Sequence, residues 1–213
     1  MLKCSVTVTG VDSMTNLAKL PTGPEYAVLY SETSDNKKRY PSRSEVVYLL
    51  RDLKELGHKC AVHVCGGAAK KSLIRGAIPD VVENVSRIQV NGLVEFRTLS
   101  ELASVYRQHR IIVQMFEGNL PLLGITSRNV EFLADQSGGR GFLPNRWVRP
   151  STAARCGFAG GLRPSNVRDE LKAIQRAAGG NDFWIDVESG VRDDDDWMDV
   201  GLVAKFVAAC CDR

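Results

Sequence analysis

The sequence predicts a single (β/α)8 barrel over residues 1–213, an α/β fold with eight parallel strands and some shortened helices. Eight short apolar runs recur along the chain, helical or turn-rich segments separate them, and glycine turns follow the last two runs. Several runs are almost continuously apolar, as parallel strands covered on both faces are. Because such barrels usually need ~250 residues, we expect this shorter chain to economise in its helices.

In the first half of the chain, the predicted strands are residues 5–10, 25–30, 59–64 and 86–92. Residues 13–22 leave room only for a short helix. Residues 42–57 predict a longer one, with leucines and valines on one side and a glycine at its end.

In the second half, the predicted strands are residues 110–116, 129–135, 155–160 and 183–189. Amphipathic helices are expected over 98–109, after Ser/Thr caps, over 165–180, and over 193–211, where a run of acidic residues suits a helix N-terminus. Segments 117–127 and 142–152 contain glycine or proline, which shorten or interrupt helices. A doubly wound open sheet is the alternative, but no Gly-x-Gly-x-x-Gly follows an early strand.

Composition and charge narrow the class of protein. With 28 basic and 25 acidic residues, the net charge of +3 does not favour a nucleic-acid partner. No run approaches the ~18 apolar residues of a membrane span and no signal peptide is recognisable, so we expect no membrane partner and a cytoplasmic location. The six cysteines form no Cys-x-x-Cys pair, so we expect no metal site. We also expect no cofactor, and a monomer or homodimer.

The glycine turns point to a phosphate. In such barrels the loops after strands seven and eight commonly hold a phosphate through backbone N–H groups. Gly160 and Gly161 follow the seventh run, before a helix expected near residue 165, and Ser189 and Gly190 follow the eighth. A small phosphorylated ligand is therefore the expected partner.

Four segments resemble one enzyme family in order along nearly the whole chain. "GFAGGLRPSNV" (157–167) and "IDVESGV" (185–191) are similar to the strand-seven and strand-eight signatures of phosphoribosylanthranilate isomerase. "NKKRYPS" (36–42) and "LADQSGGRGF" (133–142) resemble its segments after strands two and six. The resemblance implies a barrel that converts a phosphoribosylated aromatic amine from aldose to ketose, an Amadori rearrangement, without a cofactor.

The resemblance also assigns residues to roles. It implies that Asp135 is the general acid and that Arg39 contacts a substrate carboxylate. It places Gly160, Gly161, Ser189 and Gly190 at phosphate-binding positions, and Asp186 at the barrel mouth, where we expect it to bind the sugar.

The sequence departs from the family at the chemical centre. Thr9 stands where the family has the cysteine that serves as general base, and a threonine hydroxyl does not ionise near neutral pH. In the fourth predicted strand, Asn91 replaces the family's usual histidine, and in the eighth, Glu188 replaces a serine beside the expected phosphate.

A replacement base is conceivable on the third predicted strand. His63 and Cys65 are two residues apart and share a face, so an inward orientation would place a thiol and an imidazole at the mouth. A buried histidine beside a buried thiol is the alternative. The acidic run 193–196 is interpreted as a solvated helix start and not as a metal site.

Two functions stay open. The first is an isomerase of a small phosphorylated sugar derivative, of the aldose–ketose type, with altered chemistry. The second is a catalytically inactive protein of the same fold that binds a phosphorylated ligand, which the threonine at position 9 and the asparagine at position 91 favour.

Overall fold

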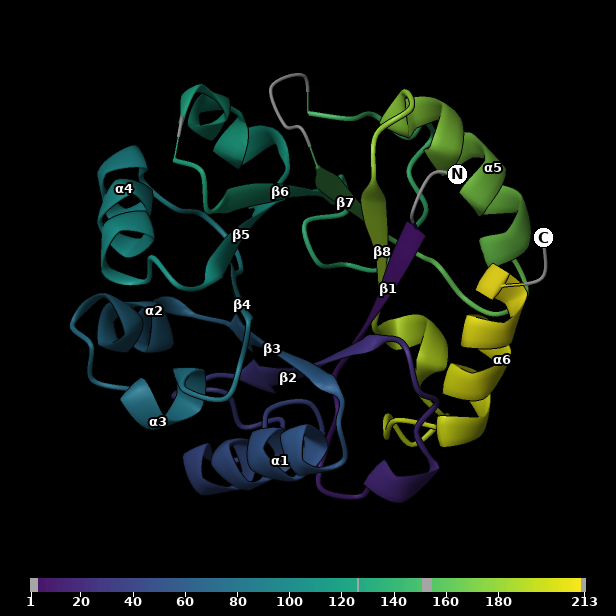
Figure 1. Ribbon diagram of the computed structural model, residues 1–213, viewed down its shortest axis with the longest axis horizontal. Helices are drawn as coiled ribbons and strands as arrows, with labels where there is room; N and C mark the ends of the chain where they lie inside the picture. The colour runs from purple at the N-terminus through teal and green to yellow at the C-terminus, as the bar shows by residue number, and fades with distance from the viewer. Residues whose placement is uncertain (1–3, 126, 151–154, 212–213) are drawn as a thin grey trace.

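Eight parallel strands close into a barrel in the computed structural model, which describes residues 4–125, 127–150 and 155–211. Each strand pairs with its neighbours in chain order, and β8 pairs with β1 (Figure 1). The strands are β1 (Cys4–Thr9), β2 (Glu25–Tyr30), β3 (Lys59–Val64), β4 (Arg87–Val90), β5 (Arg110–Met115), β6 (Val130–Ala134), β7 (Cys156–Ala159) and β8 (Phe183–Val187). The predicted fold class is confirmed, and closure excludes the open sheet.

Helices surround the barrel, as Figure 1 shows. The α-helices are α1 (Arg43–Glu55), α2 (Gly67–Ile74), α3 (Pro79–Val82), α4 (Phe96–Val105), α5 (Val167–Ala178) and α6 (Val200–Cys211). The described ranges also contain the 3-10 helices η1 (Leu17–Lys19), η2 (Glu117–Gly124) and η3 (Ser189–Val191). The expected shortening of helices is therefore found at η1, at η2 and after β6, where no helix forms over 136–150. Residues 151 and 152 of the segment expected to be interrupted lie outside the described ranges.

The longest helix, α1, shows how the sequence sets its own boundaries. Ser42 caps it through a reciprocal pair of hydrogen bonds with Glu45, a capping box. Val46, Leu50 and Leu53 are fully buried on the side that packs against β2 and β3.

Two helices begin away from their expected starts. The N-cap of α4 is Glu95, which makes no side-chain capping bond, so the Ser/Thr cap predicted there is wrong. The helix predicted from residue 193 begins only at Val200, because the acidic run before it folds into a turn. Within that turn, Asp193 accepts bonds from the N–H groups of Asp195 and Trp197. No helix in the described ranges is long and apolar enough to cross a membrane.

The barrel interior has three layers. Polar side chains line a cavity at the C-terminal ends of the strands, and charged side chains line another at the N-terminal ends. Between them lies a small apolar cluster of Ile112, Leu133 and Trp184. The upper cavity is therefore closed from below by an indole and two aliphatic side chains.

The middle layer depends on a glycine. Gly157 on β7 faces Trp184 on β8, and a Cβ at Gly157 would lie 2.1 Å from Trp184 Cε2. The guanidinium groups of Arg87 and Arg155 lie 4.3 and 5.2 Å from the centre of the Trp184 ring. Arg87 also pairs with the buried Glu25 at 2.6 Å, so the indole is held from below by a charged cluster.

Candidate active site

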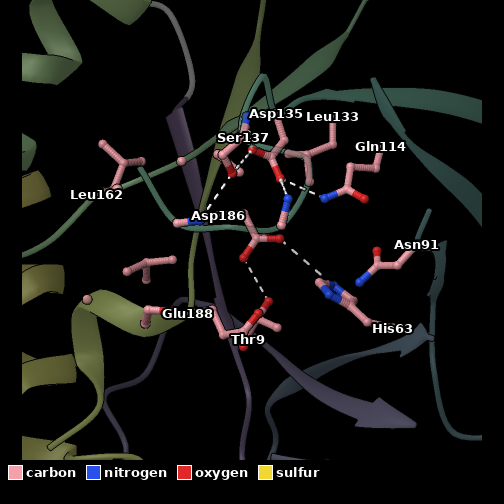
Figure 2. A pocket seen from close by; sticks show the side chains of 18 of the residues that line it. Thr9, His63, Asn91, Gln114, Leu133, Asp135, Ser137, Leu162, Asp186 and Glu188 are labelled. Atoms are coloured by element: carbon pink, nitrogen blue, oxygen red, sulfur yellow. Dashed lines mark hydrogen bonds and ion pairs between the residues drawn. The ribbon is translucent and has the colours of Figure 1, made fainter. Parts of the chain in front are cut away.

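The upper cavity encloses about 280 Å³ at the mouth of the barrel (Figure 2). Its polar wall is formed by side chains near the ends of six strands: Thr9, His63, Gln89, Asn91, Gln114, Asp135, Asp186 and Glu188. Its other wall is formed by the turns after β7 and β8. The structure thus brings both predicted carboxyl groups and the predicted glycine turns into one cavity.

Asp135, after β6, is held in a dense set of hydrogen bonds. Its Oδ1 accepts from the N–H of Ser137 at 3.0 Å and from the Ser137 hydroxyl at 2.6 Å. Its Oδ2 accepts from Gln114 Nε2 at 2.6 Å and from the N–H of Gly139 at 2.8 Å. The carboxylate therefore fixes the start of the loop over residues 136–141.

Asp186, on β8, has a different environment. Its side chain is 6% exposed, and Oδ1 accepts a hydrogen bond from the Thr9 hydroxyl at 2.7 Å. Its Oδ2 lies 3.9 Å from His63 Nε2. Burial raises the pKa of the Asp186 carboxyl to about 8. Thr9 thus serves as a hydrogen-bond donor to a carboxyl group for which the sequence predicts a role in sugar binding.

The predicted thiol and imidazole pair is not joined directly. Gln89 Nε2 lies 3.2 Å from His63 Nδ1 and donates to Asn91 Oδ1 at 2.8 Å, and Asn91 Nδ2 lies 3.2 Å from Cys65 Sγ. Burial lowers the pKa of His63 to about 3 and raises the pKa of the Cys65 thiol to about 12. Both groups are neutral at physiological pH, which favours the buried, hydrogen-bonded alternative.

The turns after β7 and β8 approach one another closely. Gly160 and Gly161 have φ values of +122° and +60°, and a Cβ at Gly161 would lie 2.5 Å from the Leu143 backbone nitrogen. A Cβ at Gly190 would lie 2.0 Å from the Leu162 carbonyl oxygen. Close packing therefore requires these glycines, apart from any ligand.

The first of these turns also offers unused donors. Among the described residues, the N–H groups of Gly161 and Leu162 find no acceptor, and both residues line the cavity. The Asn166 side chain holds the turn by donating to the Gly161 carbonyl and accepting from the Arg163 N–H. Since Asn166 is also the N-cap of α5, the helix N-terminus follows the turn directly.

Arg163 is a site residue that the sequence-based assignment misses. It lies between the two glycine turns, lines the cavity and is exposed. Its side chain makes no hydrogen bond or ion pair within the described part of the chain. The only sequence signal for it is a basic residue two positions after Gly161, inside the "GGLRPSNV" stretch.

Arg39 reaches the rim of the barrel but is already paired. Its guanidinium contacts Glu188 and Asp196, each at 2.7 Å, and Arg39 is not part of the cavity wall. The buried Arg192 also binds Asp196, at 3.0 Å, and Asp12 at 3.1 Å. The acidic run is thus not simply a solvated helix start, because Asp196 belongs to this network.

The Glu188 carboxyl lies between the network and the cavity. Burial raises its pKa, while the neighbouring Arg39 and Arg192 lower it. Among the residues with a described placement, no group of three or more His, Cys, Asp or Glu side chains is arranged to hold a metal ion.

Comparisons with known proteins identify the fold. No protein-family model and no curated protein sequence matches the chain. A structure of TrpF from Jonesia denitrificans is 19% identical, with a TM-score of 0.68 over 99% of this chain and 100% of that one. Phosphoribosylanthranilate isomerase from Thermotoga maritima is 16% identical, with a TM-score of 0.68 over 99% and 100%.

A third similar structure contains a ligand. It is a phosphoribosyl anthranilate isomerase in complex with reduced 1-(o-carboxyphenylamino)-1-deoxyribulose 5-phosphate, 16% identical, with a TM-score of 0.70 over 97% of this chain and 98% of that one. At these identities the likeness establishes a phosphoribosylanthranilate isomerase-like barrel, and the site itself must indicate the function.

Proposed function

We propose that this barrel binds a small phosphorylated sugar derivative at its C-terminal mouth and interconverts its aldose and ketose forms. The observation that carries the proposal is the arrangement of one cavity, with donors suited to a phosphate on one wall and the two aspartates Asp135 and Asp186 on the other. The residue pattern that resembles phosphoribosylanthranilate isomerase supports the same reaction class.

The phosphate is proposed to lie in the turn after β7. Donors and positive charge come from the N–H groups of Gly161 and Leu162, which have no acceptor among the described residues, from the Arg163 guanidinium and from the N-terminus of α5. Ser189 and Gly190, across the cavity wall, complete the proposed phosphate site.

The rim of the barrel next to the proposed phosphate site is unusual. Because Glu188 and Asp196 already occupy the Arg39 guanidinium, a substrate carboxylate would have to displace Glu188 in order to reach it. We therefore expect the ligand to present hydroxyl or amine groups, which can donate to Glu188, more readily than a carboxylate.

Calorimetric titration with inorganic phosphate and with ribose 5-phosphate tests the binding step. Arg163→Ala is expected to weaken both ligands by about tenfold or more, because a charge-assisted hydrogen bond contributes about 1.5–3 kcal/mol. Arg176→Ala, which replaces an exposed arginine in the last turn of α5, is the matched control and leaves both affinities unchanged. Equal losses in the two variants would contradict the proposed phosphate site.

The catalytic step is tested separately. The glycosylamine that forms from ribose 5-phosphate and anthranilate is supplied, and the appearance of the ketose is followed by chromatography. A second set of glycosylamines without a carboxylate probes the rim, and faster turnover of that set is the expected result.

A catalytically inactive, ligand-binding barrel is the second candidate. It is favoured by Thr9 at the family's base position and by the neutral state of His63 and Cys65. Phosphate binding without turnover in the unmodified protein, together with turnover in Thr9→Cys, would favour this candidate over the isomerase.

A further inference from the structure

The two aspartates of the cavity differ in how many of the acceptor positions of their carboxyl groups are used. A carboxylate has about four lone-pair positions. Four donors occupy those of Asp135: the Ser137 N–H and hydroxyl, Gln114 Nε2 and the Gly139 N–H. These four donors leave Asp135 no free acceptor position toward a ligand.

Asp186 retains free positions. Thr9 is its one hydrogen-bond donor among the described residues, and His63 Nε2 stands off at 3.9 Å. Figure 2 shows the Asp186 carboxyl between Thr9, His63 and Asp135, within the cavity that both aspartates line. Its remaining acceptor positions are therefore available to a ligand in that cavity.

The charges around Asp186 allow it to hold and release a proton. The pKa of Asp186 is raised to about 8, and burial is the largest cause. The hydrogen bond from Thr9 and the charge of Arg87 from β4 lower this pKa. The charges of Glu188, on the same side of β8, and of Glu25, from β2, raise it further. The neutral His63 supplies no compensating charge. Near neutral pH the group is thus mostly a carboxylic acid with an accessible conjugate base.

Resting on the proposed isomerase function, we propose that Asp186 is the residue that transfers protons in this site, and that Asp135 and Thr9 are positioning residues. Asp186 would then perform the step for which the chain lacks a thiolate at position 9. Asp135 would fix the loop over 136–141, and Thr9 would orient the reacting carboxyl group.

One carboxyl group balances the reaction. The Asp186 proton passes to the ring oxygen as the bond from that oxygen to C1 breaks, and the nitrogen lone pair forms a C1=N double bond. The resulting carboxylate takes the proton from C2; the C2–H electrons form a C1=C2 double bond, and the iminium electrons return to nitrogen. Asp186 is again an acid, and the enolamine gives the ketose by moving its hydroxyl proton to C1. Because the ring oxygen and C2 are both bonded to C1, one carboxyl group can serve both in turn.

The experiment compares Asp186→Asn with Asp135→Asn, using the ribose 5-phosphate–anthranilate glycosylamine for turnover and inorganic phosphate for binding. Asp186→Asn is expected to lower kcat by about a hundredfold or more while phosphate affinity stays within about twofold. Asp135→Asn is expected to act mainly by raising KM. Turnover that survives Asp186→Asn, or a larger kcat loss in Asp135→Asn, would overturn the assignment and leave the isomerase function standing.

Two readouts separate this role from a structural one. In the unmodified protein, the infrared band of a protonated carboxyl group at pH 7 should vanish in Asp186→Asn, and its absence from the unmodified protein would overturn the proposal without any substrate. In Thr9→Val the inflection of the pH–rate profile should move upward, because the Thr9 hydrogen bond lowers the pKa of Asp186, and Thr9→Ser should restore it. Phosphate binding with no turnover in the unmodified protein would overturn the isomerase function and this role together.

Discussion

Replacing Gly157 by alanine tests the apolar layer that closes the cavity from below. The new methyl group would lie 2.1, 2.4 and 2.5 Å from Trp184 Cε2, Nε1 and Cζ2. The indole is fully buried and has Arg87 and Arg155 stacked against it, so it has little room to retreat. Overpacking of a core costs about 1–3 kcal/mol, and three contacts this short place Gly157→Ala at the upper end.

A loss of about 3 kcal/mol should lower the melting temperature of a chain this size by about 6–12 °C. Urea denaturation followed by circular dichroism measures the free energy directly. Gly67→Ala, where a new Cβ has no heavy atom within 4 Å, is the matched control and should leave stability nearly unchanged.

A double-mutant cycle isolates the clash. In a Trp184→Leu background, which removes the indole atoms concerned, Gly157→Ala should lose about 2 kcal/mol less stability than in the unmodified protein. An equal loss in both backgrounds, or no loss in the single variant, would refute the packing argument.

Three further predictions concern charge. Glu188→Gln should raise the affinity for inorganic phosphate about fivefold, because it removes a nearby negative charge whose repulsion costs about 1 kcal/mol. Calorimetry measures this affinity, and an unchanged or weaker affinity would contradict the prediction. Cys65 should resist Ellman's reagent at pH 8 while the exposed Cys211 reacts at once, because burial raises the pKa of the Cys65 thiol to about 12. Mass spectrometry locates the labelled cysteines, and rapid labelling of Cys65 would refute this prediction. Stability should fall by about 2 kcal/mol between pH 6.5 and 8. There the folded state retains the Asp186 proton that the unfolded chain has lost, whereas below pH 6.5 the depressed pKa of His63 contributes an opposite slope. A flat profile in denaturation experiments, or one unaltered by Asp186→Asn, would contradict this account.

The periodic pattern predicts the barrel well because strands buried on both faces leave a strong signal. Each predicted strand overlaps an observed one, and the fold class is confirmed. Helix starts are less predictable. The acidic run before α6 resembles a helix N-terminus locally, but Arg39, which is distant in sequence, and the nearby Arg192 hold Asp196 in a turn with a φ of +64°.

The candidate site is predictable in its positions more than in its roles. The motifs place the glycine turns and both aspartates at one mouth, where the structure has them. The number of donors around Asp135 and the burial of Asp186 depend on contacts between different strands, which no single motif contains. Arg163 cannot be predicted from the sequence for a related reason: only the three-dimensional structure shows that its side chain has no partner among the residues with a described placement.

The layer around Trp184 divides the barrel into a lower and an upper half that tolerate substitutions to different degrees. Below it, paired charges such as Arg87 and Glu25 depend on one another and resist change one residue at a time. Above it, substitutions can accumulate at the mouth without reaching those pairs. A chain built in this way can change side chains at the mouth and keep its scaffold. The upper half is therefore a suitable place to install new chemistry by design.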